Sequence, residues 1–347
     1  MQAKTTASGT LTPDMVPDLD KSGAFIDAFD AVLSDLDGVV YAGPHAIPGA
    51  PEALQALAPR GVRLGYVTNN ASRSTAEVAA HLRELGAPAA DEDVVSSAQA
   101  GADLLARQVP AGSRVLVTGS SALAHEIEAR GLIPVHSAHD APVAVIQGFS
   151  PDLGWRDLAE ATYAVASGAL WIATNTDLTI PQARGIAPGN GSLVNAVRAA
   201  TGKEPLVAGK PEAPLFLTAA ERLGAERPVV VGDRLDTDIL GGNRAGFATA
   251  AVLTGVDTTE TILAARTDER PKYILATLAD LYEPYAGPEA FDGGWRAARS
   301  TARVEGSSVR VTGSPEDVDA WRAACAAWWE AHPAAERETA PEIVWES

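Results

Sequence analysis

The chain has 347 residues, of which 46% are hydrophobic and 21% charged, a balance typical of a globular protein with two or three domains. Its 45 acidic and 27 basic residues give a formal net charge of −18, which, without a visible basic patch, excludes nucleic acid as a partner. The single cysteine excludes an internal disulfide, and we see neither a signal peptide nor an apolar run long enough for a membrane span, so we expect a cytoplasmic protein with no membrane partner.

The amino-terminal part of the chain separates into a tail and a folded region. Residues 1–24 are polar, contain two prolines and show no periodicity, which predicts a flexible tail. From residue 25 onward, short apolar runs alternate with helical patterns. The first series of predicted elements is strand 31–33, helix 51–57, strand 62–67 and helix 75–85. This alternation predicts a parallel sheet with crossover helices.

Three further groups of predicted elements follow. The second series is strand 115–117, helix 122–129, strand 143–146, helix 155–165 and strand 170–173. The third series is helix 214–223, strand 229–231, helix 238–245 and strand 249–252. Beyond residue 288 the pattern changes to a hairpin of 302–305 with 308–311 and a helix over 315–329, in a region rich in tryptophan.

This order predicts an α/β fold with a doubly wound, Rossmann-like parallel-sheet core. We assign residues 25–99 and 206–287 to the core and residues 100–205 to a large α/β cap domain inserted into it. Residues 288–347 form a small carboxyl-terminal β-β-α extension whose role is open.

Polar residues follow the core strands. Asp35 and Asp37 follow the first strand, Thr68 the second, and Asp233 the strand at 229–231. Each of them alone could be a turn or helix cap, and Lys210, before a proline, could be a solvated lysine. Because the carboxyl ends of parallel strands form one ligand crevice, we expect these side chains to converge there.

Four motifs in the same order resemble those of the haloacid dehalogenase superfamily. They are DLDG at 35–38, TNN at 68–70, Lys210 and GDRLDTD at 232–238. The resemblance covers residues 25–284 and points to the capped IIA branch, which includes NagD-like and 4-nitrophenylphosphatase-like phosphatases. More narrowly, the chain resembles actinobacterial glycerol-3-phosphate phosphatases, which also carry a carboxyl-terminal extension.

The resemblance implies a role for each motif residue. Asp35 would attack phosphorus and form an aspartyl phosphate, and Asp37 would protonate the leaving oxygen and then activate water. Thr68, the backbone N–H of Asn69 and Lys210 would hold the phosphate oxygens. A carboxylate that approaches a phosphate dianion meets like charges worth about 4 kcal/mol each at 4 Å, so the site needs cations.

Magnesium is the second cation that the resemblance implies, beside Lys210. The metal would be held by the side chains of Asp35 and Asp233 and by the backbone carbonyl of Asp37. Asp238 would orient the metal's waters or Lys210, although it could equally be the N-cap of a helix that begins there.

The inserted cap domain is expected to select the substrate. It would close over the core and exclude water, with the loop at 175–192 facing the leaving group. In this loop Asn175, Asp177 and Arg184 are candidates for substrate contact, although a solvated loop is the simpler explanation of the sequence.

These motifs predict a Mg²⁺-dependent phosphatase for small phosphorylated metabolites, which is a phosphoric monoester hydrolase. Glycerol 3-phosphate is the favoured substrate and phosphoglycolate the next, with nucleoside monophosphates or pyridoxal phosphate as alternatives. An alternative function from another class is a protein that binds phosphate esters or recruits a partner with little turnover. A homo-oligomer is also possible from the sequence. A dinucleotide-binding module is disfavoured because no Gly-x-Gly-x-x-Gly follows the first strand.

Overall fold

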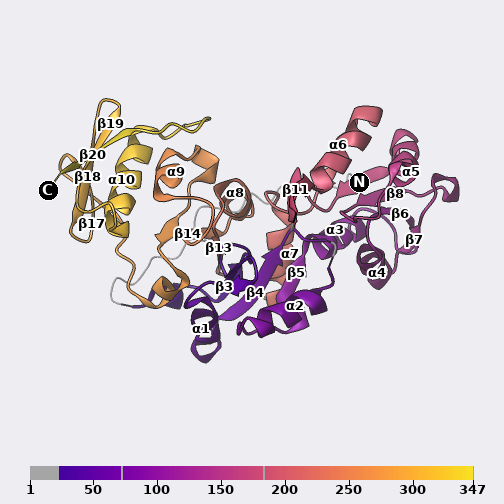
Figure 1. Cartoon of the computed structure of the whole chain (residues 1–347), viewed down its shortest axis with the longest axis horizontal. Coiled ribbons are helices and arrows are strands. Elements are labelled where there is room, and N and C mark those ends of the chain that lie inside the picture. The colour runs from indigo at the N-terminus through magenta and orange to yellow at the C-terminus, as the bar shows by residue number, and fades with distance from the viewer. Residues whose placement is uncertain (1–22, 72, 183, 347) are drawn as a thin grey trace, which may run out of the picture.

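The structure is a computed structural model that describes residues 23–71, 73–182 and 184–346. Residues 1–22 of the predicted tail lie outside the described residues. Figure 1 shows three units in a row along the long axis, with the carboxyl-terminal unit at one end, the core in the middle and the cap at the other end.

The core is a six-stranded parallel sheet in the order β15-β14-β13-β1-β4-β5. Its strands are β1 (Ala31–Ser34), β4 (Arg63–Thr68), β5 (Val94–Ser96), β13 (Pro228–Gly232), β14 (Ala248–Val252) and β15 (Tyr273–Leu275). From β1 the chain proceeds to β4 and β5 on one side and later returns to β13 on the other. The boundary between β1 and β13 is therefore the point where the strand order reverses, at which doubly wound sheets bind their ligands.

Helices cover both faces of this sheet. They are α1 (Ala50–Gln55), α2 (Thr75–Glu84), α3 (Ser97–Ala106), α7 (Pro214–Leu223), α8 (Leu240–Arg244) and α9 (Thr259–Ala264). The local sequence determines where several of these helices begin or end. Ser74 and Glu77 form a capping box at the start of α2, and Gly224, at φ +62°, ends α7 in the left-handed conformation.

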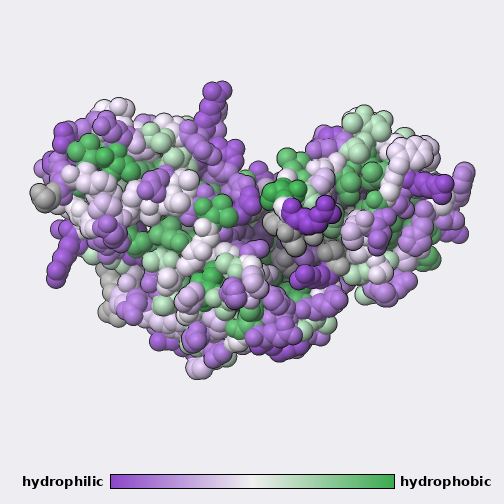
Figure 2. Space-filling view, viewed as in Figure 1, coloured by the Kyte–Doolittle hydropathy of each residue, from purple (hydrophilic) through white to green (hydrophobic). Residues whose placement is uncertain are grey.

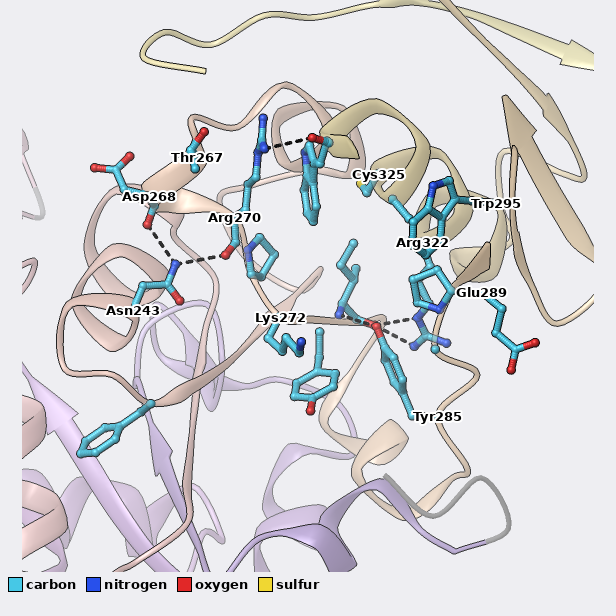
Figure 3. A pocket seen from close by; sticks show the side chains of 18 of the residues that line it. Asn243, Thr267, Asp268, Arg270, Lys272, Tyr285, Glu289, Trp295, Arg322 and Cys325 are labelled. Carbon is cyan, nitrogen blue, oxygen red and sulfur yellow. Dashed lines mark hydrogen bonds between the residues drawn. The ribbon is translucent and has the colours of Figure 1, made fainter. Parts of the chain in front are cut away.

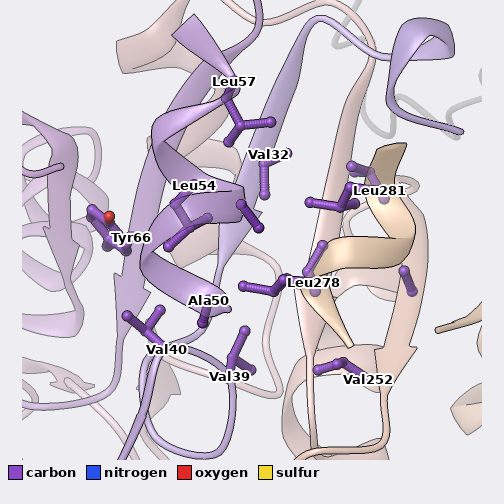
Figure 4. Packing of buried hydrophobic residues seen from close by; sticks show 14 of the residues in the cluster. Val32, Val39, Val40, Ala50, Leu54, Leu57, Tyr66, Val252, Leu278 and Leu281 are labelled. Atoms are coloured by element: carbon purple, nitrogen blue, oxygen red, sulfur yellow. The ribbon is translucent and has the colours of Figure 1, made fainter. Parts of the chain in front are cut away.

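The side chains of each core strand point alternately to the two faces of the sheet, so the hydrophobic core has one layer on each face. Val32 of β1 packs with Leu54 of α1 and with Leu278 of the 3₁₀ helix η8 (Leu278–Tyr282), as Figure 4 shows. The next residue, Leu33, packs on the opposite face with Phe216 of α7. Successive side chains of a strand point to opposite faces, so an uninterrupted buried strand contributes to both layers.

The cap is a second α/β unit, a five-stranded parallel sheet in the order β12-β9-β8-β6-β7. Its strands are β6 (Arg114–Thr118), β7 (Ile133–Val135), β8 (Ala144–Gln147), β9 (Leu170–Ala173) and β12 (Leu206–Val207), and its helices α4 (Ser121–Ala129), α5 (Trp155–Ala166) and α6 (Asn190–Thr201). Because β12 pairs with β9, the cap sheet continues past the predicted boundary at 205 to Val207.

The predicted cap loop at 175–192 contains regular structure. An antiparallel hairpin of β10 (Thr179–Gln182) and β11 (Gly185–Pro188) occupies most of it, and α6 begins at its end. The hairpin carries Pro181 and Pro188, which are tolerated because a two-stranded hairpin has only edge strands.

The carboxyl-terminal unit is larger than the predicted hairpin and helix. It has five strands, β16 (Glu289–Phe291), β17 (Gly294–Ala297), β18 (Ser300–Glu305), β19 (Ser308–Thr312) and β20 (Glu342–Glu346), and one helix, α10 (Val318–Ala331). The predicted hairpin is β18 with β19, while β20 pairs parallel to β19 after the crossover through α10. Trp321 and Trp328 of α10 are buried in the hydrophobic cluster of this unit.

The visible surface is mainly hydrophilic. Figure 2 shows hydrophilic residues spread over one face of the molecule, with smaller hydrophobic patches between them. Among the described residues, none of the helices has both the length and the apolar character needed to cross a bilayer.

Candidate active site

The site lies where the sheet reverses its strand order. Asp35 follows β1 directly and Asp233 follows β13, and these two strands are parallel neighbours with Ser34 opposite Val231. Both aspartates line a cavity of about 950 Å³ together with Asp37, Thr68 and Lys210. The cap supplies a facing wall that includes Phe149, Asn190 and residues 175–180.

Lys210 is held between two carboxylates. Its Nζ lies 2.5 Å from Oδ1 of Asp35 and 2.7 Å from Oδ1 of Asp238. Only 3% of Lys210 is exposed. Burial disfavours its charge, but the carboxylates of Asp238 and Asp35 outweigh burial and raise the pKa of Lys210. The lysine is therefore a fixed positive charge beside the proposed nucleophile.

Asp238 is not the N-cap of a helix. It lies inside a π-helical turn, η6 (Leu235–Ile239), that continues into α8. Its Oδ1 accepts from Lys210 and its Oδ2 accepts from the backbone N–H of Arg234 at 3.2 Å. Burial and then the charge of Asp35 raise the pKa of Asp238. Single π turns are frequent at functional sites, and this one directs a buried carboxylate at the lysine.

Asp233 has one carboxylate oxygen without a partner. Its Oδ2 accepts from the backbone N–H of Val256 at 2.8 Å, whereas the buried Oδ1 has no hydrogen-bond partner among the described residues. Two glycines leave room for this side chain, since a Cβ on Gly38 or Gly255 would lie 2.2 or 2.0 Å from Oδ2. Burial and then the Asp35 charge raise the pKa of Asp233 to about 6.

The acidic groups fit a hard divalent cation. One carboxylate oxygen from each of Asp35, Asp233 and Asp238 lies within 4.8 Å of the others. Both oxygens of Asp238 already have partners, but Oδ1 of Asp233 is buried and unpaired. A buried unpaired carboxylate oxygen is costly, and a cation such as Mg²⁺, which takes one or two carboxylates, would satisfy it. The geometry favours Asp35 and Asp233 as ligands over Asp238.

Metal-free protein should be less stable at pH 8 than at pH 5.5. The folded-state pKa of Asp233, about 6, lies above the ordinary value of about 3.8, so the folded state binds more protons between these values and its stability falls as the pH rises. Mg²⁺ stabilises the ionised form, so it should raise the melting temperature more at pH 8 than at pH 5.5. Thermal melts in EDTA and in Mg²⁺ at both pH values measure this difference.

Asp233→Asn is the control for that experiment, because it removes the titrating group and should shrink the extra effect of Mg²⁺ at pH 8. An equal rise in melting temperature at the two pH values in the wild type would contradict the expectation.

Asp37 projects into the cavity from the turn after β1. Its side chain is exposed toward the cavity, and partial desolvation followed by the Asp35 charge raises its pKa. A raised pKa suits a group that must first donate and then accept a proton near neutral pH. Gly38, at φ +82°, makes the turn, and Thr254 Oγ1 fixes it by donating to the Gly38 carbonyl at 2.7 Å.

Asn69 connects the core motif to the cap loop. Its Oδ1 accepts from the backbone N–H of Lys210 at 2.8 Å, and its Nδ2 lies 3.2 Å from both carboxylate oxygens of Asp177. Its backbone carbonyl accepts from Asn175 Nδ2 at 2.7 Å and from Ser97 Oγ at 2.7 Å. Asn175 and Asp177, predicted as substrate contacts, therefore use these groups to join the cap loop to the core.

Asp177→Ala should loosen this connection. The carboxylate is largely buried, and burial, its largest influence, raises its pKa, so the bond from Asn69 is its main compensation. Hydrogen bonds to charged groups contribute about 1.5–3 kcal/mol, which corresponds to a loss in kcat/KM of roughly 10- to 150-fold if the connection positions the cap. Steady-state kinetics would measure this loss, mainly as a higher KM. The exposed Asp152, also in the cap, provides the control Asp152→Ala, and equal kinetics in both variants would contradict the role.

The remaining predicted residues differ in their placement. Thr68, at the end of β4, is buried and its Oγ1 accepts from the backbone N–H of Asn70 at 3.1 Å. Arg184 lies exposed at the turn of the β10–β11 hairpin and is not among the described residues that line the cavity, so its contact with substrate stays a prediction. The sequence reading missed Thr254 and Val256, which follow β14 and could have been found by the same rule about strand ends.

Comparisons with known proteins identify the family to which the chain is similar. A family model described as haloacid dehalogenase-like hydrolase matches residues 32–133, and a second, described as HAD-hydrolase-like, matches residues 207–281. A D-glycerol 3-phosphate phosphatase of Mycobacterium tuberculosis is 50% identical over 254 residues, which are 73% of this chain and 71% of that protein.

Two solved structures extend the comparison. The structure of a glycerol phosphate phosphatase from Mycobacterium tuberculosis in complex with magnesium matches with a TM-score of 0.83 and 43% identity, over 94% of this chain and 96% of that one. A p-nitrophenyl phosphatase from Archaeoglobus fulgidus matches with a TM-score of 0.66 and 30% identity, over 74% of this chain and 98% of that one.

Proposed function

The chain belongs to the haloacid dehalogenase-like hydrolases, and on that basis we propose that it is a Mg²⁺-dependent phosphatase of small phosphomonoesters, with glycerol 3-phosphate as the favoured substrate. The observation that carries the proposal is the convergence of Asp35, Lys210 and Asp233 at the point where the core sheet reverses, with Oδ1 of Asp233 lacking a partner among the described residues. The names of the relatives supply the choice of substrate class.

Asp35 is the nucleophile in the mechanism that we propose. One of its carboxylate oxygens attacks phosphorus, the bond from phosphorus to the substrate oxygen breaks, and an aspartyl phosphate forms. Lys210, 2.5 Å from Asp35, offsets repulsion between the carboxylate and the phosphate, a repulsion of about 4 kcal/mol per charge pair at 4 Å. Its position between two carboxylates fixes the lysine before substrate arrives.

Asp37 moves the protons. Its carboxyl group gives a proton to the departing oxygen, so the alcohol leaves neutral. The resulting carboxylate then takes a proton from the water that attacks phosphorus, the bond to Asp35 breaks, and inorganic phosphate is released. The raised pKa of Asp37 favours the protonated form that the first of these steps needs.

The metal would be held by Asp35 and Asp233 and by the backbone carbonyl of Asp37. When bound there, Mg²⁺ supplies positive charge to the phosphate oxygens and orients the phosphate. Asp238 would keep Lys210 in place rather than bind the metal, because both of its oxygens are already used.

The cap wall supports a small leaving group. Phe149, Leu178 and Ile180 line the cavity from the cap, and they would exclude water from the leaving group once the cap closes. Phosphoglycolate follows glycerol 3-phosphate in our order of substrates, and nucleoside monophosphates and pyridoxal phosphate come after them. A protein that binds phosphate esters with little turnover is less favoured, since every side chain that the chemistry needs is present.

A substrate panel tests the proposal. Phosphate release should depend on Mg²⁺, and glycerol 3-phosphate should give the highest kcat/KM among these four kinds of ester. Release that is equally fast in EDTA would exclude the mechanism. Binding of the esters without release would instead support the low-turnover alternative.

We also propose a cellular location and an oligomeric state for this chain. A single, buried cysteine suits a cytoplasmic protein, since it offers no disulfide to an oxidising compartment. That the chain forms a homo-oligomer is a prediction, and light scattering would test it by measuring the mass in solution.

A further inference from the structure

A second cavity lies on the side of the core opposite the cap. It measures about 1270 Å³ and is formed by α8, the segment 267–274 and Tyr285 from the core, together with β17 and α10 of the carboxyl-terminal unit. In Figure 1, α10 and β17 lie toward the end of the molecule away from the cap, and α8 lies nearer the middle. Among the described residues, none lines both this cavity and the active-site cavity.

Aromatic rings from both units form its walls. Trp295 of β17, Trp329 of α10 and Tyr285 line the cavity, and Figure 3 shows Trp295 and Tyr285 on one side of the open centre. Both indole N–H groups have partners, because Trp295 donates to Glu330 at 2.7 Å and Trp329 to the Leu263 carbonyl at 3.1 Å. Because Arg270 lies over the ring of Trp329, 5.5 Å from its centroid, we take Trp295 as the ring that offers the cavity an apolar face, which suits a flat ring or an aliphatic group.

Two of the four cations that line the cavity are already neutralised. Arg244 pairs with Glu212 at 2.5 Å. Arg322 pairs with Asp319 at 2.6 Å and lies over the ring of Tyr285, 4.0 Å from its centroid.

The other two cations, Arg270 and Lys272, have no carboxylate partner among the described residues. Arg270 donates only to backbone carbonyls, the shortest bond being 2.7 Å to His332, and Lys272 is exposed without an ion pair. They lie two residues apart in the segment that leads into β15, and both line the cavity.

The acidic residues of the lining do not cancel these charges. Asp268 and Glu289 are on the rim, and Figure 3 shows both carboxylates directed away from the centre. Glu289 also pairs with Arg296 at 3.7 Å. In a chain with a net charge of −18, a cavity with two cations that lack a counter-ion is a local exception, and it favours an anionic occupant.

We propose that this cavity binds a small anionic metabolite with an aromatic ring, and that its occupancy acts on the active site. The anionic group would pair with Lys272, with the charge of Arg270 nearby, and the ring would lie against Trp295.

A short segment of closely packed residues connects this cavity to the active site. Asn243 and Arg244 of the cavity wall belong to α8, which continues directly from the π turn η6 that contains Asp238. Leu235 and Ile239 of that turn are buried in one cluster with Trp321 and Trp328 of α10. A ligand that shifts α8 or α10 therefore shifts the segment that holds Lys210 in place.

The binding test uses the full chain in Mg²⁺ and the anionic aromatic dye 8-anilinonaphthalene-1-sulfonate, which contains no phosphate ester and cannot be turned over. Lys272→Met and Trp295→Leu should each weaken dye binding about tenfold, the value of one good ionic or aromatic contact. The matched controls, Lys203→Met and Trp155→Leu, alter exposed residues of the cap and should bind the dye like the wild type. Equal dye affinity in all five proteins would overturn the site. Circular dichroism and thermal melts check that each variant is folded.

The kinetic test measures kcat/KM for p-nitrophenyl phosphate with and without saturating dye. The dye should change the wild-type value at least twofold and leave Lys272→Met unchanged. Binding without any change in wild-type kinetics would overturn the coupling. The binding measurement needs no turnover, so its outcome is independent of the phosphatase proposal.

Discussion

Replacing Asp35 with asparagine is expected to reduce kcat for phosphate release by about 10⁴-fold or more, the scale seen when a nucleophile is removed from an enzyme. Asparagine has nearly the same shape, and its amide oxygen can still accept from Lys210, so the site should stay assembled. What the variant loses is the negative oxygen that attacks phosphorus. Single-turnover assays with glycerol 3-phosphate, with and without Mg²⁺, would measure the loss.

The same variant should be more stable than the wild type in EDTA at pH 8. Lys210 keeps Asp238 as its charged partner in this variant. The charge of Asp35 is the second cause, after burial, of the raised pKa values of Asp233 and Asp238, so its removal relieves repulsion between the carboxylates. Lower activity together with lower stability would indicate a folding defect instead, and unchanged stability would contradict the expected gain. Asp152→Asn, at an exposed cap position, should change neither property, and an active Asp35→Asn enzyme would contradict the mechanism.

Lys210→Met is expected to lower kcat/KM by roughly 10²–10³-fold, the usual effect of removing one group that stabilises a developing charge. It should also destabilise the protein, because the loss of one partner from a buried ion pair costs about 3–5 kcal/mol. Here the loss leaves the carboxylates of Asp35 and Asp238 facing each other without the cation between them.

Part of the stability lost in Lys210→Met should return at low pH, where protonation of Asp238 removes one of the two charges. Urea denaturation at pH 5.5 and pH 8 would measure this recovery. Lys203→Met, at an exposed cap position, is the matched control and should behave like the wild type. A Lys210→Met enzyme with wild-type kcat/KM would exclude the lysine from the chemistry.

The class of fold was predictable because its signals are local and strong. Buried strands such as β1 and β13 are short apolar runs that end in Asp35 and Asp233, and a parallel sheet must bring such ends to one edge. The comparisons confirm the family and the fold class. Lys210 does not follow a strand of the core sheet, so its place beside Asp35 was expected from the family motif rather than from this topology.

Contacts that depend on a particular tertiary neighbour could not be predicted in the same way. The hydrogen bond from Asn69 to Asp177 requires the cap loop to reach a specific side chain of the core. The spacing of apolar residues in the sequence does not indicate how close those two side chains lie. The β10–β11 hairpin was read as a loop because its prolines and glycines are typical of turns. Strand β20 pairs parallel to β19, and α10 lies between the two strands in the sequence. No hairpin turn therefore marked β20 as a strand in the sequence.

The pair of glycines around Asp233 has a consequence for how this enzyme can change. Any side chain at position 38 or 255 would collide with the carboxylate of Asp233, so the wall that performs the chemistry has almost no room for variation. The opposite wall, with Phe149, Leu178 and Ile180, belongs to a separately folded unit and carries no such restriction. New substrate preferences should therefore arise by mutation of the cap, and a directed-evolution library would be best confined to those positions.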